Sequence, residues 1–149
     1  MGVGGTIVLD LWALLLTRVF NVPATNWAMV GRWLGNMPRG VFAHRSMAEA
    51  PPVTGETAIG WAFHYAIGIG YGLLLLAVCG REWFERPTLL PPMILVWAAL
   101  VLPYFVMMPG MGSGVAGART ARPNVARLKS LATHSVFGLG LYVSASVFA

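Results

Sequence analysis

Three ionisable side chains lie inside long apolar stretches of the 149-residue sequence: Asp10, His64 and His134. Counted from the nearest basic segment, each lies roughly 10–15 Å along a helix that rises 1.5 Å per residue. An ionisable residue at that depth in a bilayer costs roughly 2.5–3.5 kcal/mol and normally faces a partner inside the bundle. We therefore expect the three side chains to form one intramembrane polar site.

Three kinds of chemistry suit this site. In the first, Asp10 accepts hydrogen bonds from a His or Tyr of another span and only fixes the packing. In the second, which is our functional prediction, the site carries protons or a small solute through a transport module. In the third, His64 and His134 are axial ligands of a non-covalent haem b in a membrane anchor or electron-transfer subunit, or they join Asp10 as metal ligands. No cofactor is predicted under the favoured reading, and the sequence leaves the metal open. A structural accessory subunit remains a further alternative.

Both histidines occupy the same pattern, A-x-H-x-x-[IF]-G-[IL]-G, over residues 62–70 and 132–140. Small residues also recur every four positions around each histidine, which lets two helices approach closely in lipid. The glycines are explained either by this packing or by room for a cofactor. The repeated pattern suggests two tandem helical hairpins.

The composition identifies the elements that must hold these residues. Hydrophobic residues make up 57% of the chain and charged residues 10%, whereas a soluble domain carries about a quarter charged residues. A membrane-spanning helix needs about 20 apolar residues. We therefore predict an all-α, four-helix transmembrane bundle in a single domain, residues 1–149, with spans at about 3–20, 57–78, 88–108 and 125–148.

The positive charge of the chain, +5 net, is explained by topology, and no nucleic-acid partner is predicted. Short cytoplasmic loops collect Lys and Arg. The loop between spans one and two and the loop between spans three and four are much richer in these residues than the loop between spans two and three. Both long loops are therefore expected in the cytoplasm and both termini in the periplasm. The arginines expected to contact lipid headgroups or anions are Arg32, Arg39, Arg119, Arg122 and Arg127.

The first long loop contains apolar residues at helical spacing: Trp27, Val30, Leu34 and Met37. This pattern predicts a short amphipathic helix in the headgroup layer. The polar residues expected on its other side are Arg32, Asn36 and Arg39. In the third span, Pro103 removes a backbone donor and predicts a kink.

Several classes of protein are excluded or disfavoured by what the sequence contains. With Cys79 as the single cysteine, no intrachain disulfide can form. The phosphate-binding, serine-hydrolase and zinc-protease motifs do not occur, so we predict that the chain is not an enzyme. The first basic residue, Arg18, follows the first apolar run, which argues against a cleaved signal peptide. His44, beside Arg45, is expected to be solvated.

Several further motifs accompany the histidine pattern: Asp10-Leu11-Trp12-Ala13, Asn26-Trp27, Gly31-Arg32-Trp33, Met37-Pro38-Arg39-Gly40 and the run from Thr133 to Tyr142. Together they resemble a family of small bacterial inner-membrane proteins with four predicted helices, catalogued as a domain of unknown function. The resemblance extends over almost the whole chain and implies four spans and an inner-membrane location, but no activity. A chain of this size in the lipid bilayer is expected to form a homo-oligomer or to join a larger membrane complex.

Overall fold

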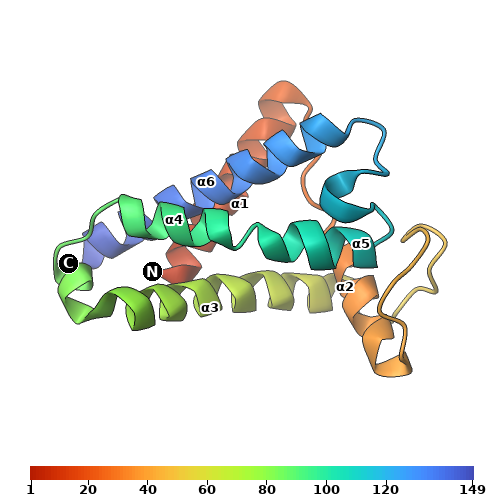
Figure 1. The fold of residues 1–149 in the computed structure, drawn as a ribbon, viewed down its shortest axis with the longest axis horizontal. Coiled ribbons are helices and arrows are strands. Elements are labelled where there is room, and N and C mark those ends of the chain that lie inside the picture. The colour runs from red at the N-terminus through yellow and green to blue at the C-terminus, as the bar shows by residue number, and fades with distance from the viewer. The chain divides into compact units, whose positions relative to one another are not determined.

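The computed structural model describes residues 1–149 apart from the side chain of Phe148. Over these residues the chain is helical with no strand, which confirms the all-α class. The main helices are α1 (Gly2–Phe20), α2 (Trp27–Asn36), α3 (Glu56–Glu85), α4 (Leu90–Ala98) and α6 (Pro123–Phe148) (Figure 1). The shorter elements are η1 (Met37–Arg39), the π-helical turn η2 (Pro103–Met107), α5 (Met108–Gly110) and η3 (Val115–Gly117).

Among the described residues, three helical stretches are long and apolar enough to cross a membrane: Gly2–Phe20, Glu56–Glu85 and Leu90–Gly110. They overlap the predicted spans 3–20, 57–78 and 88–108, the second extending to Glu85 and the third to Gly110, and they indicate a membrane protein. The predicted fourth span, 125–148, is helical as part of α6, which has 26 residues. It is not among the three stretches, and the polar residues Lys129, Ser130 and His134 lower its hydropathy. A fourth span therefore stays a prediction.

By its internal packing the chain divides into two compact units, and each is described by itself. The first unit contains residues 1–25, 65–98 and 132–149, and the second contains residues 26–64 and 99–131. Helix α3 and helix α6 each run from one unit into the other.

The first unit is held together by close contacts between helices. A Cβ atom at Gly2 of α1 would overlap the backbone of Gly68 in α3, so these two helices touch through their glycines. The buried core of the unit contains Val96 of α4 with Phe137 and Leu141 of α6. These apolar side chains join α4 to α6.

The second unit is built where α2 crosses the start of α3. A Cβ at Gly31 would overlap the carbonyl oxygen of Glu56, and a Cβ at Gly60 would overlap that of Trp27. Only glycine permits this approach, because the obstructing atoms are backbone. Trp33 of α2, 5% exposed, lies in the buried cluster beside this crossing. The predicted helix in this loop is thus confirmed as a helix, with a packed rather than a free face.

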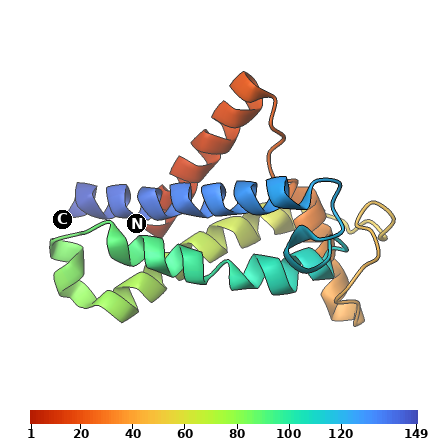
Figure 2. The same ribbon diagram turned by 45° about the horizontal axis from the view of Figure 1, so that its top comes forward.

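Two irregularities interrupt the long helices. Gly80 adopts φ 74° and ψ 178° inside α3, and the helix changes direction there, in its green part (Figure 2). In the third candidate span, the backbone amide of Met108 donates to the carbonyl of Pro103, five residues back, in a π-helical turn. Pro103 has no amide hydrogen to continue an α-helix. The irregularity predicted at Pro103 is therefore present.

Candidate functional site

Asp10 of α1 is joined to Tyr65 of α3 inside the first unit. The Tyr65 hydroxyl donates a hydrogen bond to Asp10 Oδ2 over 2.9 Å, and both residues are half-buried. The carboxylate comes from one candidate span and the hydroxyl from another. The structure thus contains the hydrogen bond from a Tyr of another span that the sequence offered as one of its alternatives.

His134 of α6 belongs to the same unit as Asp10 and is half-buried. The next residue, Ser135, accepts a hydrogen bond from the indole nitrogen of Trp97 over 3.0 Å. Since Trp97 lies in α4, this bond fixes the α6 segment that carries His134 relative to α4.

His64 lies in the second unit and is 7% exposed. Its imidazole stacks on Trp27 of α2, with ring centroids 4.0 Å apart and an interplanar angle of 26°. Trp61 meets the same imidazole edge-on, at 5.6 Å and 65°. These aromatic contacts place His64 in the α2–α3 crossing. Because Asp10 and His134 belong to the first unit, the predicted convergence of all three residues stays a prediction.

The glycines that follow the two histidines face neighbouring helices. A Cβ at Gly68 would overlap the Thr6 hydroxyl of α1, and a Cβ at Gly138 would lie 2.9 Å from both Met93 and Val96 of α4. Helix packing therefore accounts for these glycines, and they give no argument for a cofactor. Haem ligation by the histidines remains a prediction that an absorption spectrum tests.

Metal ligation receives no structural support. Among the side chains that the structure describes, no group of three or more His, Cys, Asp or Glu residues is placed to hold a metal ion. The suggested set of Asp10, His64 and His134 is therefore left without a geometric argument.

A second charged arrangement, absent from the sequence predictions, joins α2 to the start of α3. Arg32 donates from Nε to Glu56 Oε2 over 2.8 Å and from Nη2 to Oε1 over 2.7 Å. The two side chains are 15% and 18% exposed. The Nη1 atom of Arg32 also donates to the carbonyl of Met47 over 3.2 Å. Arg32, predicted to contact lipid or anions, is thus engaged within the protein.

This ion pair shifts the titration of both partners. The hydrogen bonds from Arg32 and then the backbone amide of Val53 lower the pKa of Glu56 to about 2. The hydrogen bonds to Glu56 raise the pKa of Arg32. Glu56 is the first residue of α3, so the pair lies at the end of this helix that meets the loop. Both groups remain charged at neutral pH.

The other arginines predicted to contact lipid or anions are exposed: Arg39, Arg119, Arg122 and Arg127. Arg127 donates to the carbonyl of Ala116 and to the side chain of Asn124, each over 3.1 Å. Their contact with headgroups or anions stays a prediction.

Two polar residues, Asn36 at the end of α2 and His44 in the loop that follows, are more buried than the sequence predicted. The Nε2 atom of His44 is buried and has no hydrogen-bond partner among the described residues. Asn36 is 2% exposed, and its amide donates to the carbonyls of Arg32 and Pro51. Both predictions were wrong because the loop after α2 folds back over this helix. Helical periodicity carries no information about such a loop.

The resemblance to a domain-of-unknown-function family is tested by comparison with known proteins. Neither a curated protein nor a solved structure matches the chain. The model of the family described as "Protein of unknown function (DUF2938)" matches residues 1–148, which confirms the resemblance, and the chain therefore belongs to this family.

Proposed function

We propose that this chain is a small inner-membrane transport module, not an enzyme, in which Asp10 carries a proton or helps to bind a small solute. One observation supports the proposal above the others. The carboxyl group of Asp10 lies within one candidate span and accepts a hydrogen bond from the hydroxyl of Tyr65, which lies in a second candidate span. A carboxylate inside the hydrocarbon is costly, so its ionisation is coupled to the groups that face it.

The pair has two protonation states with different bonding. An ionised Asp10 only accepts hydrogen bonds, whereas a protonated Asp10 also has a hydrogen to donate. Tyr65 donates in the first state and is free either to donate or to accept in the second. Proton binding would therefore change the contact between α1 and α3, which is the coupling that a proton-linked transporter needs.

The proposed topology has four spans, two basic cytoplasmic loops and periplasmic termini, with α6 as the fourth span and the chain forming a homo-oligomer. Its test is labelling of single cysteines placed in each loop and at each terminus. Cys79 is the only cysteine of the sequence, so a Cys79→Ser background makes every label unambiguous. Termini that react only from the cytoplasmic side would overturn the orientation.

The function is tested by proton flux in liposomes containing a pH-sensitive dye. We expect Asp10→Asn, which keeps the shape of the side chain but cannot ionise, to abolish flux, and Tyr65→Phe to lower it. Glu85→Gln removes an exposed carboxylate from the far end of α3 and should leave flux unchanged. Folding of each variant is checked by thermal unfolding in detergent. Wild-type flux in a folded Asp10→Asn protein would refute the proposal.

A further inference from the structure

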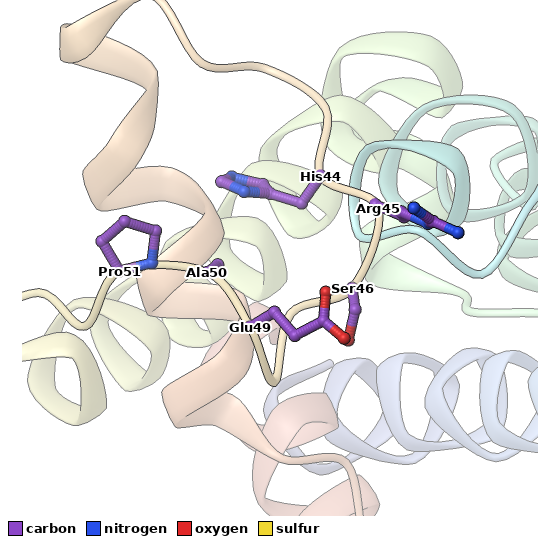
Figure 3. A pocket seen from close by; sticks show the side chains of 6 residues that line it. All are labelled: His44, Arg45, Ser46, Glu49, Ala50 and Pro51. Atoms are coloured by element: carbon purple, nitrogen blue, oxygen red, sulfur yellow. The ribbon is translucent and has the colours of Figure 1, made fainter.

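The loop between η1 and α3 borders a shallow cavity of about 210 Å³ that is largely open to solvent (Figure 3). The lining residues come from one short segment: His44, Arg45, Ser46, Glu49, Ala50 and Pro51. Pockets that enclose a drug-sized ligand measure about 300–1,000 Å³. The cavity therefore suits a group of a few heavy atoms.

The walls of the cavity are fixed by the second unit. The backbone amide of His44 donates to the carbonyl of Gly110 over 2.8 Å, which anchors the start of the loop. At its other side, the guanidinium of Arg32 binds the carbonyl of Met47, and Ala50 is 7% exposed. The polar side chains of the loop are thus presented by a backbone that is held in place.

Two exposed side chains of opposite charge, Arg45 and Glu49, line the cavity without pairing. Within the described part of the chain neither Arg45 nor Glu49 forms an ion pair, although both line the cavity. Figure 3 shows Arg45 at one end, His44 and Pro51 at the other, and the Glu49 carboxylate between them, turned toward Ser46. The buried Nε2 atom of His44 also lacks a partner.

We propose that this cavity binds a zwitterionic group of the phosphoethanolamine type, with a phosphate and a primary ammonium. The phosphate pairs with the guanidinium of Arg45 and the hydroxyl of Ser46. The ammonium donates to the carboxylate of Glu49 and faces the His44 end of the cavity. A simple anion would be repelled by Glu49 and a simple cation by Arg45, so a ligand that carries both charges fits best. A quaternary ammonium has no N–H to donate and should bind more weakly.

The same headgroup chemistry occurs in membrane phosphatidylethanolamine and in free phosphoethanolamine. Two measurements separate these sources. In the first, O-phosphoethanolamine is titrated calorimetrically into the purified protein in detergent. In the second, the protein is reconstituted in nanodiscs of mixed phosphatidylethanolamine and phosphatidylcholine, and native mass spectrometry identifies the lipids that it retains. Binding only in the nanodisc assigns the site to the lipid headgroup, and binding of the soluble probe assigns it to the free compound.

Charge-neutralising variants test the two ends of the cavity separately. We expect Glu49→Gln to remove the preference for ethanolamine over choline compounds. We expect Arg45→Gln to weaken binding of the phosphate group by about tenfold, the effect of losing about 1.4 kcal/mol. Glu85→Gln and Arg86→Gln make the same charge changes at exposed positions outside the loop and should leave binding unchanged.

Three results would overturn the proposal. The first is equal retention of ethanolamine and choline lipids by the wild-type protein together with no binding of O-phosphoethanolamine. The second is wild-type binding in a folded Glu49→Gln protein. The third is stronger binding of inorganic phosphate than of O-phosphoethanolamine, which would make the cavity a simple anion site.

Discussion

In both copies of the A-x-H-x-x-[IF]-G-[IL]-G pattern the first glycine packs against a neighbouring helix, but the second glycine does so in only one copy. Gly68 packs against α1 and Gly138 packs against α4. Among the described atoms, a Cβ at Gly70 would meet nothing within 4 Å, whereas a Cβ at Gly140 would lie 3.0 Å from the backbone of α1. The same pattern therefore contains a tightly packed second glycine in one copy and an unobstructed one in the other, and the neighbouring helix determines the difference.

At the first glycine the contacts follow the order of the helices along the chain. Helix α3 meets α1 through Gly68, and α6 meets α4 through Gly138. Two tandem hairpins would make this arrangement, with each second helix packed on its own first helix. The second glycine departs from it, since Gly140 packs on α1 and Gly70 on no helix of the described structure.

The largest effect is expected just upstream of the first copy, at Gly60. A Cβ there would overlap the carbonyl oxygen of Trp27, a backbone atom that has nowhere to move. Overpacking typically costs about 1–3 kcal/mol and occasionally more, so Gly60→Ala should lose about 3 kcal/mol or fail to fold. Thermal unfolding in detergent measures it, with Gly70→Ala as the control that keeps the same change of residue. Equal stability of the two variants would contradict the α2–α3 crossing.

Gly68→Ala is expected to come next, at about 1–3 kcal/mol. The obstructing atom is the hydroxyl of Thr6, a residue with 0% exposure whose hydroxyl donates to the carbonyl of Gly2 over 2.9 Å. Because that hydroxyl is the cause, Thr6→Ala should partly rescue Gly68→Ala in a double-mutant cycle. Strictly additive losses would mean that Thr6 and Gly68 do not meet.

The third prediction separates the second glycines of the two copies. Gly140→Ala should destabilise by about 1 kcal/mol, because its Cβ would press against the backbone of α1. Gly70→Ala should be neutral or stabilise by up to about 1 kcal/mol, because alanine favours the helix and meets no obstacle. The midpoints of thermal unfolding of Gly140→Ala and Gly70→Ala, each compared with the wild type, test this prediction. Changes of the same sign would remove the distinction between the copies.

The smallest effect on stability concerns the first turns of α3 and α6, the helices that contain the two copies. Helix α3 begins with Glu56 paired to Arg32, whereas the first turn of α6 contains no acidic residue. The pKa of Glu56 is lowered from its ordinary value of 4.5 to about 2. A lowered pKa adds stability above pH 4.5, and that stability is lost as the pH falls toward about 2.

Glu56→Gln should therefore lower the midpoint of thermal unfolding at pH 7, and its difference from the wild type should shrink below about pH 4.5. Glu85→Gln, at an exposed position, should show no such pH-dependent difference. A difference between Glu56→Gln and the wild type that stays constant from pH 7 to pH 3 would show that the ion pair does not contribute through the charge of Glu56.

The helices could be predicted from sequence because long apolar runs and the residues that interrupt them are local signals. The helical spacing of the apolar residues from Trp27 to Met37 is visible within a single segment, and Pro103 by itself predicts an irregular helix. The fold-back of the loop over α2 left no comparable signal. Glu56 lies 24 residues after Arg32, and nothing in the spacing of the loop pairs them.

In the candidate site, too, the local feature could be predicted from sequence and the contact between helices could not. Asp10 could be recognised because a carboxylate in an apolar run is conspicuous, but its partner could not be chosen among the four tyrosines of the sequence. Selecting Tyr65 requires the rotation of α3 relative to α1, which depends on contacts such as that between Gly68 and Thr6. The stacking of His64 on Trp27 likewise depends on a helix crossing, not on the histidine motif.

The bend at Gly80 also determines the length of the straight part of α3. A straight helix of 30 residues would be about 45 Å long, well beyond the about 30 Å of a hydrocarbon core. The conformation at Gly80, φ 74° and ψ 178°, is open almost only to glycine. Arg81 and Glu82 therefore leave the axis of the preceding helix. By lacking a single side-chain carbon, position 80 shortens the straight part of α3 and brings it nearer to the length that the hydrocarbon core of a bilayer would match.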